Sequence, residues 1–266
     1  MSQQVREGAE AEDRFVMEMN KNGNDPRWKY LGIDAENHYA VRVTTQKLSM
    51  IHGKKVYCKS DVFVAKSEQE VNKFHLTEND LENYGLEPVN ATGISIKKDD
   101  AENIQWQKLG INAVGNLSIP KQFGAGISLY ERKGTNHQSL NESMNANQTI
   151  VEKWCNTIEN FVEFYEKEIP NTSKLFDSTE SDEIRQEIAR EIGKIADKKM
   201  KEVIDNDEEL QKKIFWGIGV FPEPFCASYV FEDSKLRKTT GYTPKYSITT
   251  GNSRTKNFTI AIKGSK

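Results

Sequence analysis

Two charged residues, Asp61 and Lys97, interrupt stretches of the chain whose pattern is otherwise that of β-strands. In the second stretch Ser95 and Lys97 alternate with two isoleucines, as they would along a half-buried strand. An aspartate on one strand and a lysine on its neighbour would form a compact site for a divalent metal ion and an attacking water. The pair therefore indicates metal-dependent hydrolysis of phosphodiester bonds.

Glu12 is a third residue of interest, because it falls in the middle of the apolar side of the first predicted helix, residues 5–20. A carboxylate that points at a core must be paired, protonated or bound to a positive group. Two interpretations stay open: a buried pair with an arginine, or a place in the same site as Asp61 and Lys97. Glu10 is the alternative candidate if the helix is rotated by a residue or two.

Other catalytic chemistries lack their sequence patterns. The four histidines show no zinc-binding spacing, and the chain has no P-loop, no GxGxxG turn and no GxSxG elbow. Phosphodiester hydrolysis, by contrast, needs a carboxylate to hold Mg²⁺ and a cation to orient or activate water. Asp61 and Lys97 would supply those two parts.

The composition is that of a polar globular protein, with 266 residues, 36% hydrophobic content and a net charge of −3. No stretch approaches the roughly 18 apolar residues of a membrane span, and the N-terminus lacks the apolar core of a secretory signal. The three cysteines, Cys58, Cys155 and Cys226, are far apart and indicate reduced thiols. These features predict a cytoplasmic protein without a membrane partner.

The order of the candidate residues resembles the PD-(D/E)xK nuclease superfamily, and within it the type II restriction endonucleases. The resemblance rests on a glutamate in the first helix, then Ser60-Asp61, then Ser95-Ile96-Lys97. The polar segment that follows, with Gln105, Gln107 and Lys108, is similar to stretches of several such enzymes and is taken as a candidate DNA contact.

This resemblance implies Asp61, Lys97, Ser95 and Glu12 as catalytic residues. It also implies that Mg²⁺ is bound by Asp61, by Glu12 and by the carbonyl of Ile96. Two positions depart from the superfamily pattern: a serine precedes the aspartate in place of proline, and Ser95 stands where the superfamily usually has Glu or Asp. A hydroxyl binds Mg²⁺ more weakly than a carboxylate does, so the remaining ligands would carry more of the metal binding.

The function that the resemblance implies is sequence-specific, Mg²⁺-dependent cleavage of double-stranded DNA, as in a type II restriction enzyme. A cognate DNA methyltransferase would then be a functional, not a physical, partner. Monomer and homodimer both stay open. The implied fold is α/β, with a central mixed sheet flanked by helices as in a restriction-endonuclease-like core.

The hydrophobic pattern predicts helices over residues 5–20, 79–84, 101–114, 150–167 and 182–204. It predicts strands over residues 38–45, 56–64, 93–97, 126–132, 214–221, 226–231, 246–250 and 257–263. We place a domain boundary in the polar stretch near residue 132. Residues 1–132 would form the catalytic nuclease core, and residues 133–266 a helical and β part that recognises DNA.

The candidates for reading DNA bases lie in two polar segments. Asn and Gln can make paired contacts to adenine, and Arg or Lys to guanine, in the major groove. The first segment supplies Arg132, Lys133, Asn136, Gln138 and Asn141, and the second supplies Asn252, Arg254 and Lys256. The chain after residue 233 contains no acidic residue, which favours phosphate binding. An ordinary solvated surface is the alternative interpretation of both segments.

Two further functions compete with the restriction-enzyme prediction. The first is a non-catalytic DNA-binding protein on the same fold, for which Ser95 is the best support. The second is a structure-specific or RNA-directed nuclease. Metal-dependent cleavage separates the first from an enzyme, and a comparison of duplex, single-stranded and RNA substrates separates the second.

Overall fold

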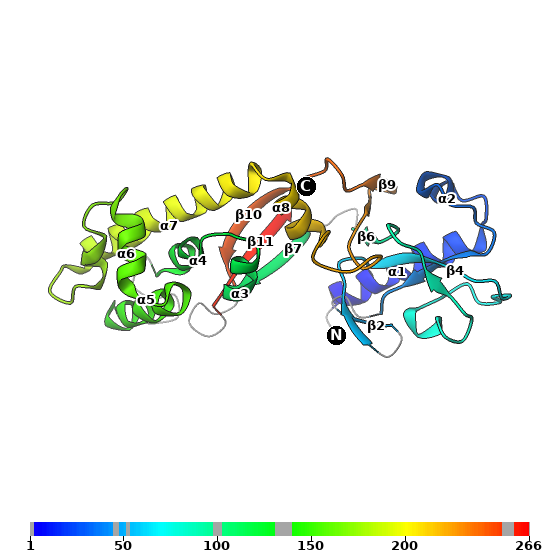
Figure 1. Ribbon diagram of the computed structural model, residues 1–266, viewed down its shortest axis with the longest axis horizontal. Helices are drawn as coiled ribbons and strands as arrows, with labels where there is room; N and C mark the ends of the chain where they lie inside the picture. The colour runs from blue at the N-terminus through cyan, green and yellow to red at the C-terminus, as the bar shows by residue number, and fades with distance from the viewer. Residues whose placement is uncertain are drawn as a thin grey trace. The chain divides into compact units, whose positions relative to one another are not determined.

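The computed structural model describes residues 3–44, 48–51, 54–97, 103–130, 140–251 and 258–265. The chain forms two compact units, coloured along the sequence in Figure 1. The first unit contains Met1–Glu102 and Gln211–Thr243, and the second contains Asn103–Leu210 and Pro244–Lys266. The boundary predicted near residue 132 therefore differs from the observed division. The chain crosses between the units three times, because the segment 211–243 returns to the first unit and adds strands to its sheet.

The first unit is built on a mixed six-stranded sheet. Its strands are β1 (His38–Arg42), β4 (Val62–Lys66), β5 (Glu87–Pro88), β6 (Ile94–Ile96), β8 (Tyr229–Glu232) and β9 (Lys235–Lys238). The order is β1-β4-β6-β8-β9, and β5 pairs with β4. All neighbours are antiparallel except β6 and β8, which are parallel. The predicted α/β class with a central mixed sheet is confirmed at this level.

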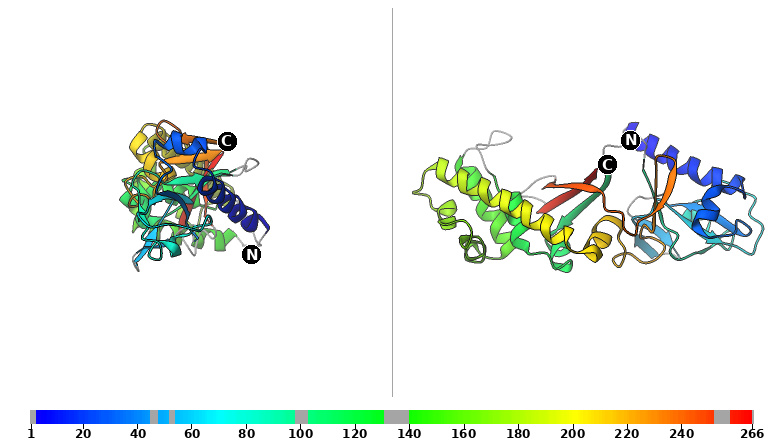
Figure 2. Two further views of the ribbon diagram at one scale, coloured as in Figure 1. Left: turned by 90° about the vertical axis from the view of Figure 1, so that its right-hand side faces the viewer. Right: turned by 90° about the horizontal axis from the view of Figure 1, so that it is seen from above.

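Strand β4 is buried on both faces, because its apolar residues alternate between two cores. Val62 and Val64 belong to the core under the helices α1 (Gln3–Lys21) and α2 (Pro26–Leu31), which we call the α1-side core. Phe63 and Ala65 belong to the core on the opposite face. In the right view of Figure 2, helix α1 (blue) lies beside the strands against which it packs.

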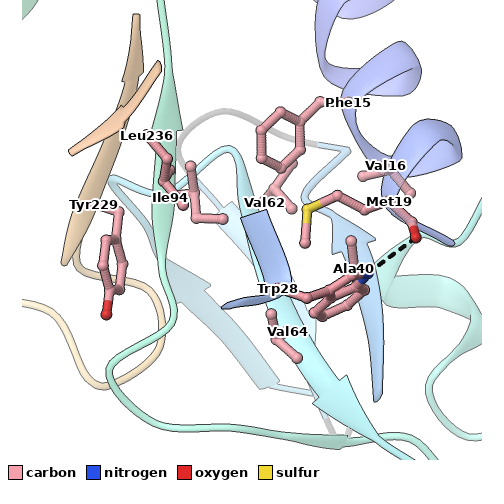
Figure 3. Close-up of a cluster of buried hydrophobic side chains, with 10 residues drawn as sticks. All are labelled: Phe15, Val16, Met19, Trp28, Ala40, Val62, Val64, Ile94, Tyr229 and Leu236. Carbon is pink, nitrogen blue, oxygen red and sulfur yellow. Dashed lines mark hydrogen bonds between the residues drawn. The ribbon is translucent and has the colours of Figure 1, made fainter. Parts of the chain in front are cut away.

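Figure 3 shows how α1 is attached to the sheet. Phe15, Val16 and Met19 point from the helix toward the strands. Trp28 of α2 packs beside Met19, and its indole Nε1 donates a hydrogen bond to the Met19 carbonyl at 3.1 Å. This contact fixes the position of α1, and with it the position of any side chain that α1 directs at the sheet.

The remaining elements of the first unit are short. They are the hairpin β2 (Leu48–Ile51) and β3 (Lys54–Tyr57), the 3₁₀ turn η1 (Glu78–Asp80) and the π-helical turn η3 (Lys212–Trp216). The predicted strand over residues 56–64 is thus two strands, interrupted at residues 58–61. The predicted strand over residues 214–221 is wrong, because η3 begins this segment and only one isolated bridge, Ile218 to Phe221, follows within the described residues.

The second unit combines helices with a three-stranded antiparallel sheet. The strands, in the order β10-β11-β7, are β10 (Lys245–Thr250), β11 (Thr259–Ser265) and β7 (Asn103–Gly110). The helices are α3 (Ile111–Asn116), α4 (Lys121–Ser128), α5 (Leu140–Cys155), α6 (Ile158–Glu166), α7 (Asp182–Asp205), α8 (Glu208–Gln211, at the junction) and the 3₁₀ turn η2 (Thr172–Phe176). Among the described residues, none of the helices is both long and apolar enough to span a membrane.

Two predictions in this unit are wrong for identifiable reasons. Residues 103–110 form β7 instead of a helix, because they pair with β11 from the far end of the chain. The predicted strand over 126–132 falls partly on helix α4, whose glycines allow tight packing. A Cβ on Gly124 would lie 2.4 Å from the Trp154 ring, and one on Gly126 would lie 2.8 Å from the Cβ of Ala196 on α7.

Candidate functional site

Asp61 lies immediately before β4 and is held by both neighbouring strands. Its main-chain N–H donates to the Ile94 carbonyl at 2.8 Å, and its carbonyl accepts from the Val43 N–H at 2.9 Å. Its carboxylate Oδ2 accepts hydrogen bonds from the Ile96 N–H at 2.7 Å and from the Ser95 hydroxyl at 3.1 Å. The structure therefore brings together three of the residues that the sequence singled out: Asp61, Ser95 and Ile96.

The carboxylate of Asp61 fills a place where main-chain pairing stops. Strands β4 and β6 are in register at Val62 and Ile94, and the Ile96 N–H finds the Asp61 carboxylate in place of a strand carbonyl. An unpaired N–H at this depth would be costly. Asp61 thus has a structural role in the sheet in addition to any chemical one. Within the described residues both of its side-chain hydrogen bonds end on Oδ2 and none ends on Oδ1.

The turn that carries Asp61 is buttressed by the segment 224–226. The N–H groups of Lys59 and Ser60 donate to the Phe225 carbonyl at 2.6 and 3.2 Å, and the Ser60 hydroxyl donates to the Pro224 carbonyl at 3.1 Å. The same segment lies against Gly93, where a Cβ would be only 2.0 Å from the Cys226 carbonyl oxygen. One stretch of main chain therefore sets the position of both the Asp61 turn and the start of β6.

Lys97 follows β6 and is fixed by a main-chain bond from its N–H to the Phe231 carbonyl at 2.8 Å. Burial lowers the pKa of the Lys97 ammonium, while the charges of Asp61, Glu12 and Glu232 act in the opposite direction. The lysine is thus surrounded by carboxylates from three different elements. These charges offset part of the effect of burial, and the pKa of Lys97 stays below its ordinary value.

Glu12 forms the buried pair with an arginine that was one of the two interpretations of the sequence, and the charge of Asp61 acts on it. Its carboxylate is 7% exposed, and the Nε of Arg42 on β1 donates to it at 2.9 Å. Burial, followed by the negative charge of Asp61, raises the pKa of Glu12 to about 7, and Arg42 opposes this shift. Glu10 is exposed on α1. Of the two N-terminal glutamates, Glu12 is therefore the one whose charge is felt by Asp61 and Lys97.

Arg42 connects Glu12 to a second acid. Its NH1 group donates to Asp13 Oδ1 at 2.8 Å, and Nε2 of His75 lies 2.6 Å from the same oxygen. The guanidinium therefore bridges two adjacent carboxylates of α1. This bridge limits the rotation of the Glu12 side chain, because Arg42 is itself held on β1.

The oxygen atoms near Asp61 are of the kind that Mg²⁺ prefers. Among the described residues no group of three or more His, Cys, Asp or Glu side chains gathers as a metal site. Mg²⁺, however, is typically bound through one or two carboxylates and keeps several waters or substrate phosphates. The carboxylates of Asp61 and Glu12 suit such a cation. Burial and, after it, the repulsion from Asp61 raise the pKa of Glu12, and the charge of the cation would relieve that repulsion.

Glu232 is a residue of this site that the sequence did not single out. It ends β8, is 4% exposed, and its charge acts on Lys97. The signal in the sequence is a single carboxylate at the end of the apolar run Tyr229–Phe231. That signal alone does not pair β8 with β6, since the whole second unit's helical segment separates them along the chain.

The described candidates for DNA contact belong to the second unit. Lys108 is exposed on β7, opposite Ala261, and Gln105 and Gln107 lie on the same strand. Asn141 lies in helix α5. The other candidates lie outside the described residues: Arg132, Lys133, Asn136, Gln138, Asn252, Arg254 and Lys256. The DNA contacts predicted for these residues stay predictions.

No protein-family model matches the chain, and neither the curated proteins nor the solved structures yield a significant match.

Proposed function

We propose that this protein is a Mg²⁺-dependent endonuclease of the PD-(D/E)xK type that cuts double-stranded DNA at a specific sequence, as type II restriction enzymes do. The observation that carries the proposal is the convergence of Asp61, Ser95 and Lys97 where β4 and β6 separate, with Glu12 on α1 close enough for its charge to act on Lys97. The finer part of the fold assignment, a restriction-endonuclease-like core in the first unit, belongs to the same proposal.

Asp61 is the main acid of the proposed centre. The hydrogen bonds from Ser95 and from the Ile96 N–H fix its Oδ2, so that Oδ1 is oriented for a cation. Ser95 accordingly acts by holding the carboxylate, which gives the serine at this position a use in place of metal binding. Glu12 adds a second carboxylate, and the Ile96 carbonyl is the third proposed oxygen donor. Mg²⁺, when bound, would polarise the scissile phosphate and favour deprotonation of a bound water.

Lys97 is the cation of the proposed centre. A charged ammonium beside Asp61 can hold the attacking water by a hydrogen bond and stabilise the negative charge that develops on the phosphate. Partial exclusion of water strengthens both interactions, because the local dielectric constant is lower than that of bulk solvent. The charges of Asp61, Glu12 and Glu232 favour the protonated form of Lys97, in opposition to its burial.

A non-catalytic DNA-binding protein is the second candidate function. Two observations favour it: Ser95 replaces the usual acid, and Asp61 is already engaged in the sheet through the Ile96 N–H. In that case Asp61 and Lys97 would be a structural ion pair, and DNA would be bound without being cut.

Digestion of plasmid and phage DNA with the purified protein, in Mg²⁺ and in EDTA, tests the proposal. Discrete bands that require Mg²⁺ and disappear in Lys97→Met would support it. Lys66→Met is the matched control, because Lys66 lies on the neighbouring strand β4 but is exposed and paired with Glu68. A smear would indicate a non-specific nuclease. Cleavage confined to single-stranded DNA or RNA would favour a structure-specific or RNA-directed enzyme, and intact DNA throughout would favour the non-catalytic candidate.

A further inference from the structure

Glu232 is a buried acid whose position in the sheet places it beside Lys97. Strands β6 and β8 are parallel, with Ile96 in register with Phe231, and the Lys97 N–H donates to the Phe231 carbonyl. Ile96 and Phe231 both pack against the α1-side core. Because side chains alternate along a strand, the next residues, Lys97 and Glu232, both turn to the other face and lie next to each other.

Tyr242, which stacks on Trp216, holds the Glu232 carboxylate by a hydrogen bond. The Tyr242 hydroxyl donates to Glu232 Oε2 at 3.1 Å. The Tyr242 ring stacks on Trp216 with ring centres 5.7 Å apart, and the indole Nε1 of Trp216 donates to the Tyr242 carbonyl at 3.2 Å. Burial and the charge of Glu232 raise the pKa of Tyr242 to about 12, so the phenol stays a donor at neutral pH.

A carboxylate in this place is not required by the hairpin that it occupies. Glu232 pairs with Lys235 through the main chain where β8 turns into β9, which any residue compatible with a strand would do. Burying a charge at 4% exposure is costly unless the charge is compensated. Lys235 is exposed, so the cation beside Glu232 on its other side, where the register of β6 with β8 continues, is Lys97. The burial of Glu232 therefore makes sense as part of the arrangement around that lysine.

We propose that Glu232, anchored by Tyr242, is a positioning residue that holds the Lys97 ammonium in place. The inference rests on the proposed function in that Lys97 is the group on which cleavage depends. Glu232 supplies from the adjacent strand a negative charge that position 95 lacks in this chain. It acts through Lys97 and is not itself in contact with the scissile phosphate.

Glu232→Gln is the informative variant, because it removes the charge and keeps the shape and an acceptor for Tyr242. Glu78→Gln is the matched control: Glu78 is a buried acid of the same unit, 5% exposed, whose carboxylate accepts from Thr44. We expect Glu232→Gln to slow single-turnover cleavage by about 10- to 100-fold at unchanged DNA affinity. Glu232→Asp should restore part of the rate, and Glu78→Gln should cleave at the wild-type rate.

A second measurement does not depend on activity. Thermal unfolding of wild type, Glu232→Gln, Lys97→Met and the double variant forms a cycle that isolates the contact between the two side chains. We expect each single change to lower the melting temperature by about 2 to 4 °C. The double change should lower it by clearly less than the sum, because neither charge is then left buried without the other.

The two measurements separate the possible failures. Coupled melting temperatures together with a slow Glu232→Gln support the inference. Additive melting temperatures overturn it whatever the rate does, and so does coupling with Glu232→Gln cleaving as fast as Glu78→Gln, since the contact is then only structural. If the wild-type protein cuts no nucleic acid, the proposed function fails. The cycle then decides alone whether Glu232 holds Lys97.

Discussion

The two units of this protein differ in what they bury. Within the described residues every buried acidic side chain belongs to the first unit: Glu12, Asp25, Glu78, Asp80 and Glu232. The buried polar side chains of the second unit are neutral, namely Ser128, Asn147 and Thr172. On its long helix α7 the pair Lys198 with Glu202 is at the surface, and in the pair Arg185 with Asp182 the acid is the more exposed partner.

We relate this difference to the proposed reaction, which needs buried charges in one unit and only a scaffold in the other. A buried charge lowers stability unless it is compensated. In a unit where such charges have no function, we therefore expect apolar residues at the buried positions. The first unit keeps two of its buried acids, Glu12 and Glu232, around one lysine at the end of the sheet. The core of the second unit, whose buried polar side chains are neutral, is that of an ordinary packed domain. The comparison therefore favours the first unit as the place of the proposed reaction, and four substitutions test it.

Asp61→Asn should have the largest effect. The amide removes the negative charge but keeps an oxygen for the Ile96 N–H, so the sheet should survive while the proposed metal site does not. We expect the cleavage rate to fall by at least about a thousandfold, measured under single-turnover conditions. Asp34→Asn, at an exposed acid of the same unit, is the control. Undiminished cleavage by Asp61→Asn would remove the reaction from this end of the sheet.

Gly93→Ala should have the largest effect on stability. A methyl group would lie 2.0 Å from the Cys226 carbonyl oxygen and 2.3 Å from that of Pro224, so the segment that supports Asp61 must move. We expect a loss of about 2 to 4 kcal/mol in the free energy of unfolding, measured by urea denaturation. At Gly23 a Cβ would meet only the Cβ of Ala35 at 3.6 Å, and Gly23→Ala should be near neutral. Equal effects of the two changes would contradict the close packing of 224–226 on β6.

Glu12→Gln tests how much the buried acid lowers the free energy of unfolding, because this loss depends on pH. The pKa of Glu12 in the folded protein, about 7, lies above its ordinary value of 4.5, so protonation stabilises the fold. Stability contributed by the protonated acid is present below pH 4.5 and is lost as the pH rises through 7. We expect the wild type to be within about 1 kcal/mol of Glu12→Gln at pH 5 and to be less stable than it by about 2 to 3 kcal/mol at pH 8.

Urea denaturation at the two pH values measures this difference, and Glu10→Gln, at an exposed position, serves as control. Mg²⁺ at pH 8 should stabilise the wild type and not Glu12→Gln, because a bound cation needs the ionised carboxylate. A stability difference that is constant between pH 5 and pH 8 would show that Glu12 stays ionised, balanced by Arg42 alone.

The sequence was sufficient to find the candidate residues that interrupt a local apolar pattern. Asp61 and Lys97 stand out because each interrupts an apolar alternation, and Glu12 stands out because it lies on the apolar side of a helix. Glu232 follows an apolar run as many surface residues do. Only the parallel pairing of β6 with β8 brings it next to Lys97 and makes it a candidate. Strand β7 was mistaken for a helix for the same reason, since its partner β11 lies at the other end of the chain. Long-range pairing is the information that local pattern lacks.

The smallest expected effect belongs to the second unit and completes the comparison. Lys198 and Glu202 on α7 form an ion pair at 3.7 Å, with side chains 77% and 54% exposed. An exposed pair one helical turn apart contributes only about 0.3 to 0.5 kcal/mol, because water and salt screen it. Glu202→Gln should therefore change the free energy of unfolding by less than about 0.5 kcal/mol, and the change should vanish in 1 M salt. A loss as large as that of Glu12→Gln at pH 8 would mean that the second unit also depends on its charges, and the contrast between the units would no longer locate the chemistry.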